Sequence, residues 1–452
     1  MAILRRRNVD IEETNDHGTT PLMIAAYLGE LPIVRLLIEA GAHIDAVDEH
    51  GYTALHLAAA RGHMYVVQYL IDQKADVDAL SQLLRTPLMY AAQYGHLSVV
   101  TILIEAEADV HAASTYGFTA LHYAAIRGHM RVVECLSQID GIDVDVTQGE
   151  GATPLYLASQ EGYPEIVQIL IDAGANVNAK KDDGMSPLFI ASQMGHLSVV
   201  RLLIQAGARL ESKEKSIGAT PLFVACFEGN GKVVQELIEA GADTEAETFS
   251  GMTSLLIAIR GGYKNVMLVL LENGADLHVR TRQGREALHV AAANGHVEIV
   301  QLLVEMDVDL EAKDKLGRTA LHMAAAGGWS LVITALLDAG ANIHARTDTG
   351  ATALHIASIE GHTDEMKVLI EAGADVDAKM TEIYTTPLYL AVYNNHTDAV
   401  RLLINEGADI DAKRRNKQTA LHVAAIQLTD MEIVKLLADN ILDLDPKDVD
   451  GD

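Results

Sequence analysis

The hydrophobic positions of this chain follow one pattern that returns about every 33 residues. The copy at residues 48–80 shows the pattern most clearly. An alanine-rich apolar run begins after Thr53 and ends before Gly62, and a second apolar stripe places Val66 and Leu70 at helical spacing. A polar stretch then leads to the next copy. The pattern predicts two short helices in each copy, joined by a tight turn and followed by a polar loop.

Each copy begins with the string Thr-Pro/Ala-Leu or a close variant of it. Neighbouring starts lie 33 or 34 residues apart, and a fixed period of this size indicates a solenoid rather than separate globular domains. Because one copy cannot bury its own apolar face, stacking between neighbours must supply the core. The first residues of the 13 copies are Thr20, Thr53, Thr86, Thr119, Thr153, Ser186, Thr220, Thr253, Glu286, Thr319, Thr352, Thr386 and Thr419.

The period accounts for the whole chain as one solenoid, residues 1–452. We expect a partial repeat at 1–14, thirteen full repeats of 33–34 residues at 15–447, and the start of a further repeat at 448–452. Neither end shows the polar capping unit that solenoids normally need. We therefore expect a segment of a longer repeat protein. The alternative is that Met1 is a true start with an imperfect cap.

Cap and turn residues agree with this pattern, with a few departures. Thr caps the predicted first helix, Pro suits its first position, and glycine between the helices permits a left-handed backbone. Leu84, Tyr384 and Lys417 replace the glycine of the polar tip, so we expect deformed hairpins there. Trp329 stands where other copies have histidine, and an insertion at 428–429 predicts an irregular helix junction.

Four spaced motifs identify a family resemblance. They are T-P-L-H in the first helix, A-A-x-x-G-H at its end, V-V-x-x-L-L in the second helix and G-A-D-V-D/N-A before the tip. The sequence resembles the ankyrin repeat over essentially its whole length. The resemblance implies an all-α repeat solenoid of helix-turn-helix units with β-hairpin tips, an ankyrin-like superhelix. It further implies that first helices and tips line a concave side that binds other proteins.

Composition narrows the classes of partner. The chain has 34 Lys and Arg against 63 Asp and Glu, a net charge of −29, which argues against general nucleic-acid binding and against docking on anionic membranes. No apolar run reaches ~18 residues, so we expect no membrane insertion. Two cysteines cannot form a disulfide framework, which favours the cytoplasm, with the nucleus as the alternative. We expect a monomer.

The residues that could carry chemistry have structural explanations. Of 19 histidines, six occupy the T-x-L-H place and seven the G-H place, where we expect them to tie helix ends to neighbouring repeats by hydrogen bonds. No H-x-x-x-H or C-x-x-C spacing occurs, so we expect no metal and no cofactor. Cys135 and Cys226 fall at small apolar places and should be structural thiols. Carboxylates fall on tips and exposed faces, so we expect no catalytic residue and no enzyme.

The resemblance points to contact positions in the tips and at the end of each first helix. In copies 1 to 4 these positions hold five aromatic side chains, which interfaces enrich. The alternatives are partial burial between adjacent tips, or chance. The five residues are Tyr27, Tyr52, Tyr94, Tyr116 and Phe118.

In copies 8 to 10 the same contact positions hold cations and no Asp or Glu. We expect this basic stretch to bind an acidic peptide, a phosphopeptide or a similar polyanion through Arg forks. The alternative is that these cations pair with carboxylates of preceding loops, such as Asp276, Asp309 and Glu311. The basic stretch comprises Arg260, Arg282, Arg285, Lys315 and Arg318.

One modification site is implied by the resemblance alone. Ankyrin proteins are hydroxylated at the Asn of V-N-A, often with a Leu eight residues earlier. Only Asn178 in this sequence matches, with Leu170 at the expected place. The alternative is that Asn178 is a plain hairpin residue.

The sequence predicts a non-enzymatic scaffold for protein–protein interaction, binding partner proteins or peptides on the concave face and the hairpin tips. The alternative is the ankyrin segment of a larger multidomain protein, such as a channel, toxin, kinase or immune receptor, whose activity lies outside this chain. A mechanical spring is a third class, which would extend elastically without a specific ligand.

Overall fold

The computed structural model describes residues 10–427 and 429–440, and within these ranges it contains 26 α-helices and no β-strand. This confirms the predicted all-helical repeat solenoid. Contacts between residues divide the chain into two compact units, Met1–Asp243 and Thr244–Asp452, called here the first and the second unit. Residues 1–9 of the predicted partial repeat, the predicted start of a repeat at 448–452, and residue 428 of the predicted insertion lie outside the described residues.

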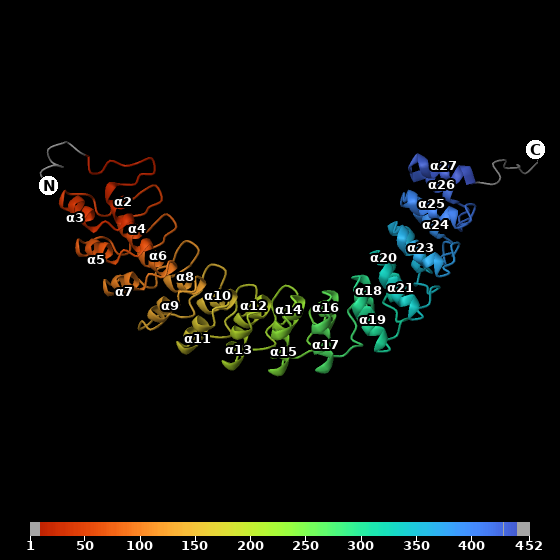
Figure 1. The fold of residues 1–452 in the computed structure, drawn as a ribbon, viewed down its shortest axis with the longest axis horizontal. Helices are drawn as coiled ribbons and strands as arrows, with labels where there is room; N and C mark the ends of the chain where they lie inside the picture. Colours follow the sequence, from red (N-terminus) through yellow and green to blue (C-terminus); the bar gives the residue numbers. More distant parts are fainter. Residues whose placement is uncertain (1–9, 428, 441–452) are drawn as a thin grey trace, which may run out of the picture. The chain divides into compact units, whose positions relative to one another are not determined.

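Helices of the first unit alternate between two layers (Figure 1). The first helices of successive repeats, from α2 through α14, pack side by side in one layer, and the second helices, from α3 through α15, pack in the other. The helices are α2 (Pro21–Leu28), α3 (Leu31–Glu39), α4 (Ala54–Arg61), α5 (Met64–Asp72), α6 (Pro87–Gln93), α7 (Leu97–Glu105), α8 (Ala120–Ile126), α9 (Met130–Ser137), α10 (Pro154–Glu161), α11 (Pro164–Asp172), α12 (Pro187–Met194), α13 (Leu197–Gln205), α14 (Pro221–Phe227) and α15 (Gly231–Glu239).

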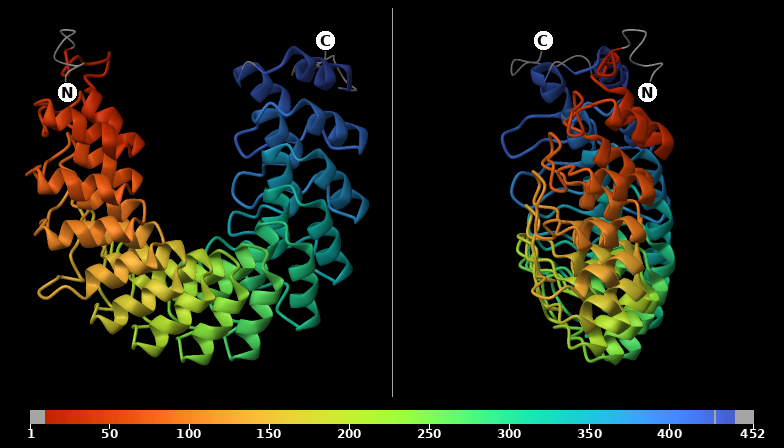
Figure 2. Two further views of the ribbon diagram at one scale, coloured as in Figure 1. Left: turned by 60° about the vertical axis from the view of Figure 1, so that its left-hand side comes forward. Right: turned by 90° about the vertical axis from the view of Figure 1, so that its left-hand side faces the viewer.

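The second unit repeats the same arrangement. Its first helices stack from α16 through α26, and each packs on the second helix that follows it. Figure 2 shows the loops between repeats projecting from one side of the helix layers. The helices are α16 (Ser254–Arg260), α17 (Lys264–Glu272), α18 (Ala287–Ala293), α19 (Val297–Glu305), α20 (Ala320–Gly327), α21 (Ser330–Asp338), α22 (Ala353–Glu360), α23 (Thr363–Glu371), α24 (Pro387–Tyr393), α25 (Thr397–Asn405), α26 (Ala420–Gln427) and α27 (Met431–Asn440).

Local chemistry sets the ends of the first helices. At α4, the Thr53 hydroxyl accepts a hydrogen bond from the backbone N–H of His56 and satisfies one of the free donors of the first turn. The helix ends at Gly62, whose φ of 74° lies in the left-handed region that favours glycine. A Cβ at Gly62 would also lie 2.6 Å from Nδ1 of His96, so no other residue fits without displacing that ring.

The core lies between the two layers of helices. In the repeat of α4 and α5, Leu55, Ala58, Val67 and Leu70 are fully buried, and the same positions are buried in the other repeats except the last, where Leu421 and Val434 are half-buried. Burial of each Leu or Val side chain contributes about 1.5–3 kcal/mol. Small alanines on the first helices allow these helices to stack closely, which explains a core with few aromatic residues.

The predicted hairpin tips are tight turns with hairpin-like hydrogen bonds, rather than β-strands. In the tip before α4, the N–H of Asp48 donates to the carbonyl of Tyr52 at 3.1 Å, and the N–H of Gly51 donates to the carbonyl of Asp48 at 3.0 Å. The next tip is joined to this one, because the N–H of Gln82 donates to the carbonyl of His50 at 2.9 Å. Such bonds hold neighbouring tips in a row within each unit.

Two of the three tips that lack glycine keep the usual turn. Leu84 and Lys417 adopt φ values of 54° and 68°, and their N–H groups close the turn at 2.8 Å, as glycine does elsewhere. The expected deformation is therefore wrong at these two tips. At Tyr384, the N–H reaches back to the carbonyl of Met380 at 3.2 Å across a turn one residue longer. The extra residue, rather than the missing glycine, changes that tip.

Histidines tie many of the repeats to their neighbours, as the sequence predicts. His56 donates from Nε2 to the carbonyl of Arg85 in the following tip at 2.9 Å. His63 donates from Nε2 to the carbonyl of Tyr27 in the preceding repeat at 2.9 Å. Trp329 occupies the position of His63 in its own repeat and makes the equivalent bond, since its indole Nε1–H donates to the carbonyl of Ala293 at 3.0 Å.

Candidate functional site

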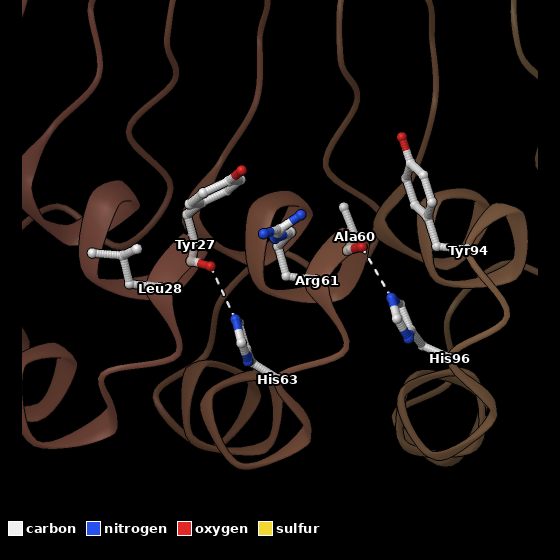
Figure 3. Close-up of a pocket in the computed structure, with 7 residues that line it drawn as sticks. All are labelled: Tyr27, Leu28, Ala60, Arg61, His63, Tyr94 and His96. Atoms are coloured by element: carbon white, nitrogen blue, oxygen red, sulfur yellow. Dashed lines mark hydrogen bonds between the residues drawn. The ribbon is translucent and has the colours of Figure 1, made fainter.

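Three adjoining clefts run along the first helices α2, α4 and α6 of the first unit. Their volumes are about 600, 420 and 160 Å³, and neighbouring clefts share lining residues. Figure 3 shows the largest, where Tyr27 and Tyr94 stand on either side of Arg61. We call this surface the aromatic groove and define it by Ile24, Tyr27, Leu28, Tyr52, Arg61 and Tyr94.

The repeat itself places these side chains on the surface. Tyr27, Leu28 and Arg61 occupy the last two positions of a first helix, and Tyr94 caps the end of α6. The preceding alanines face the neighbouring repeats and are buried. The side chains at the helix ends therefore point away from the core, and Tyr27, Leu28 and Tyr94 are 41%, 60% and 51% exposed. An apolar surface of this kind on a folded protein is typical of an interaction site.

Histidines beneath the groove fix the backbone that carries it. His63 donates to the carbonyl of Tyr27, and His96 donates to the carbonyl of Ala60 at 3.0 Å (Figure 3). These bonds satisfy carbonyls at the ends of α2 and α4 that have no partner within their helix. The backbone that carries Tyr27 and Arg61 is therefore held by neighbouring repeats of the solenoid.

Arg61 adds one positive charge to the wall of the largest cleft, whereas Asp48 lines the neighbouring cleft of about 420 Å³. Its guanidinium carbon lies 4.6 Å from the centre of the Tyr27 ring, a cation–π contact that keeps the side chain along the groove. The N–H groups of such a stacked guanidinium remain free to bind an acceptor. The groove can hold apolar side chains and one carboxylate.

Tyr52 closes the smallest cleft and is only half-buried. Its ring meets Tyr90 edge-on, with ring centres 5.5 Å apart, and the Tyr90 hydroxyl donates to the Tyr52 hydroxyl at 3.1 Å. Burial, and then this hydrogen bond, raise the pKa of Tyr90 to about 12. The wall of this cleft is thus ordered by neighbouring side chains before any ligand binds.

The other two predicted aromatic residues do not join the groove. Tyr116 is exposed at its tip. Phe118 is half-buried and packs on the cluster that contains Tyr156, Leu157 and Ile190. Sequence reasoning did not single out Leu28 and Ile24. Leu28 holds a predicted contact position, but only its exposure in the structure distinguishes it from a core leucine.

Side chains of the basic stretch fall into two groups in the second unit. Arg260, Arg282 and Lys315 are exposed, and no carboxylate pairs with them among the described residues. Arg318 donates from Nε and Nη2 to one oxygen of Asp314 at 2.9 and 2.7 Å. Arg285 lies 3.9 Å from the same oxygen.

Asp314 explains this division. Burial raises the pKa of its carboxyl, but hydrogen bonds from the Arg318 side chain and from backbone N–H groups outweigh burial and hold the pKa below its ordinary value. Asp314 is therefore ionised and neutralises part of the charge of Arg318. Pairing with a carboxylate, the alternative to polyanion binding, does occur for Arg318, although Asp314 belongs to the same tip as Arg318 and not to a preceding loop.

Asn178 has a structural role that other repeats give to an acid. Its Oδ1 accepts the N–H of Arg209 at 2.8 Å, and its Nδ2 donates to the carbonyl of Gly207 at 3.3 Å. Asp45 and Asp78 accept the equivalent N–H in their repeats. Hydroxylation of Asn178 stays a prediction. Mass spectrometry after co-expression with an asparaginyl hydroxylase tests it, and an Asn178 without added oxygen would remove it.

Other kinds of site find little support in residues 10–427 and 429–440. Within them, no three His, Cys, Asp or Glu side chains converge as metal ligands would. Each helix in the same ranges is too short or too polar to cross a bilayer. Cys226 is buried and Cys135 half-buried, and neither forms a disulfide.

The fold and these surfaces define a class, the α-solenoid built from helix pairs with exposed first helices and tips. The family model for ankyrin repeats (3 copies) matches nearly the whole chain, and the chain belongs to the ankyrin repeat family. Ankyrin repeats are in general modules for protein–protein interaction and typically non-catalytic binding scaffolds. The matched residues are 2–81, 76–148, 132–214, 206–281, 222–314, 256–347, 288–380 and 379–448.

Among solved structures, the chain is similar to the crystal structure of the human ASB11 ankyrin repeat domain. The two share 29% sequence identity with a TM-score of 0.46, and the match covers 50% of this chain and 99% of that one. We found no curated protein with a matching sequence.

Proposed function

We propose that this chain is a non-catalytic scaffold that binds a partner protein in the aromatic groove of the first unit. The observation that carries the proposal is the set of three adjoining clefts with exposed Tyr27, Leu28 and Tyr94 at their rims. Tyrosine supplies a large, rigid contact area and is enriched among residues that dominate binding energy. The chain has only two cysteines, too few for a disulfide framework, so we place its action in the cytoplasm.

A second contact surface is favoured by the three exposed cations of the basic stretch. Arg260, Arg282 and Lys315 have no carboxylate partner among the described residues, on a chain whose net charge is −29. We propose that they bind an acidic segment of a partner. Arg285 adds to this surface more weakly and Arg318 least, because Asp314 already holds it.

The groove is tested by affinity capture with the whole chain and two double variants. Tyr27→Ser/Tyr94→Ser removes the rims of the groove, and Ile33→Ser/Tyr65→Ser removes equally exposed apolar side chains from the second helices α3 and α5. The first variant should lose partners that the wild type captures, and the second should keep them. Loss in both variants, or in neither, would contradict the proposal.

A further inference from the structure

The last tip that the structure describes carries an unusual density of positive charge. Residues 413–417 read Lys-Arg-Arg-Asn-Lys, directly before α26. Lys413, Arg415 and Lys417 are exposed, and none of the described carboxylates pairs with them. We call residues 413–417 the basic tip. It is separate from the basic stretch, whose last member is Arg318.

The basic tip has a fixed shape. The N–H of Arg414 donates to the carbonyl of Gln418 at 2.9 Å, and the N–H of Lys417 donates back to the carbonyl of Arg414 at 2.8 Å. The preceding tip supports the turn, since the N–H of Arg415 donates to the carbonyl of Ile383 at 3.2 Å. The cations at this tip are therefore carried on an ordered backbone, and only their side chains must be fixed when a ligand binds.

Arg414 anchors the turn to the solenoid. Its guanidinium lies 4.6 Å from the centre of the Tyr389 ring, and its Nη1 donates to the Tyr389 hydroxyl at 2.9 Å. Tyr389 is buried on α24. This stacking occupies one face and one edge of the guanidinium. Its charge still contributes to the surface of the tip.

A cleft of about 310 Å³ lies between the two tips and is lined by Ile383, Arg414, Arg415 and Asn416. Ile383 is 40% exposed and gives the cleft an apolar wall, and Tyr384 beside it is also exposed. The charged group nearest in sequence on this neighbouring tip is Glu382, which is exposed and forms no described ion pair with the basic tip. Cations thus outnumber acids around a cleft with one apolar side.

We propose that the basic tip binds an acidic peptide segment of a partner protein, with one apolar side chain in the cleft against Ile383. Carboxylates complement Arg415 and Lys417, and an arginine fork binds a carboxylate with two parallel hydrogen bonds. The apolar wall favours a peptide over a nucleic acid, and the charge of −29 repels long polyanions that extend beyond the tip. The site goes beyond the proposed groove and basic stretch and does not depend on either.

A photo-crosslinking peptide tests the site on the whole chain. The probe is a peptide of eight glutamates with a benzophenone side chain at its centre, and its glutamine counterpart is the neutral control. Mass spectrometry of the digested adduct locates the label. We expect the acidic probe to label residues within 379–418, and we expect added salt to weaken the labelling.

Two variants with the same change in charge separate the basic tip from the rest of the second unit. Arg415→Glu/Lys417→Glu should reduce labelling within 379–418 about tenfold, whereas Arg282→Glu/Lys315→Glu should leave it unchanged. Circular dichroism checks that both variants fold. A label that falls only on 280–318, or that both variants reduce equally, would overturn the proposal.

In a last experiment, single-stranded oligothymidine with the same formal charge as the acidic probe is added as a competitor for the basic tip. We expect it to displace the acidic probe poorly. Displacement at a lower concentration than the unlabelled acidic peptide would mean a nucleic-acid site and would overturn the peptide proposal. Tyr27→Ser/Tyr94→Ser should not affect the label, so a failed groove and a failed basic tip are distinguishable.

Discussion

The groove of the first unit and the tips of the second unit are built on the same repeat backbone, but the groove is mainly aromatic and aliphatic, whereas the tips are rich in positive charge. The groove has a single cation, Arg61, among tyrosine, leucine and isoleucine side chains. The tips of the second unit are rich in cations, although the chain as a whole is strongly acidic. These cations are Arg280, Arg282, Arg285, Lys313, Lys315, Arg318, Arg346, Lys379, Lys413, Arg414, Arg415 and Lys417.

The comparison separates residues that make a repeat from residues that make a surface. Thr caps, alanines, the V-V-x-x-L stripe and the histidine ties recur in both units, because every repeat must satisfy the same neighbours. Tip positions and first-helix ends contact mainly solvent, so they can differ without a large change in stability. Some cations are not free for binding, since Arg280 pairs with Glu286, and Lys313 donates to the carbonyl of Arg346 at 3.1 Å.

Acid should distinguish the two units most strongly. Burial lowers the pKa of His122 in the first unit, and of His322 and His355 in the second, to about 4. Burial also lowers the pKa of His56 in the first unit and His289 in the second. The side chains of His122, His322 and His355 stay mostly neutral in the folded state between pH 6.5 and about 4, whereas the unfolded chain takes up protons. Stability therefore falls as the pH falls through this window.

Each histidine with a pKa of about 4 should cost about 3 kcal/mol at the acid end of the window. The second unit has two such histidines and the first unit has one, so the second unit should unfold first. Trp329 is the only tryptophan and reports on the second unit, whereas circular dichroism reports on both. At pH 5 the unfolding transition followed by Trp329 fluorescence should therefore come before the unfolding transition followed by circular dichroism.

A double variant provides the control for acid unfolding. Leu256 occupies the position of these histidines in its own repeat and is fully buried, so leucine fits there. His322→Leu/His355→Leu should flatten the acid dependence of the fluorescence transition. An unchanged dependence would mean that other groups cause the acid unfolding.

Salt and charge reversal should separate the binding surfaces next. Arg282→Glu/Lys315→Glu should weaken capture of an acidic partner at least about tenfold at low salt, and raising the salt should have a similar effect on the wild type. Partners held by the groove should resist salt. The contrast between the two surfaces would be contradicted if the partners that Tyr27→Ser/Tyr94→Ser loses were as sensitive to salt as the partners that Arg282→Glu/Lys315→Glu loses.

Replacing one tie in each unit should give smaller and equal effects. Trp329→Phe removes the donor to Ala293, and His63→Phe removes the donor to Tyr27. Each should lower the free energy of unfolding by about 1 kcal/mol, measured with urea. Trp329→His should keep most of the stability. A much larger loss in one unit would show that the ties are not equivalent.

Turns without glycine should give the smallest effect. Leu84 in the first unit and Lys417 in the second hold left-handed φ values. Leu84→Gly and Lys417→Gly should each raise the free energy of unfolding by about 0.5–1 kcal/mol, because relief of the left-handed conformation exceeds the added freedom of the unfolded chain. Urea unfolding checks this, and destabilisation by either change would contradict it.

Local signals in the sequence were enough to predict the helix pairs, because Thr53 and Gly62 act within one turn of the helix ends. The histidine ties were also predictable, since every repeat has the same neighbours. The aromatic groove was only partly predictable. Burial of Phe118 depends on the packing of a later repeat, and the pairing of Arg318 with Asp314 depends on side-chain orientation within one tip. No local residue pattern marked the division between units after Asp243.

The histidine ties have a consequence for changes in chain length. His63 reaches back one repeat and His56 reaches forward one repeat, so a repeat with both histidines is tied to both neighbours at fixed offsets. Excising or duplicating one whole period inside a unit would bring every imidazole to an equivalent carbonyl across the new junction. A deletion of any other length would leave imidazole N–H donors without their carbonyl partners on both sides of the junction. The chain can therefore lengthen by duplication of whole periods, or shorten by their deletion, without new core residues. The surface of each added repeat is then free to acquire its own partner.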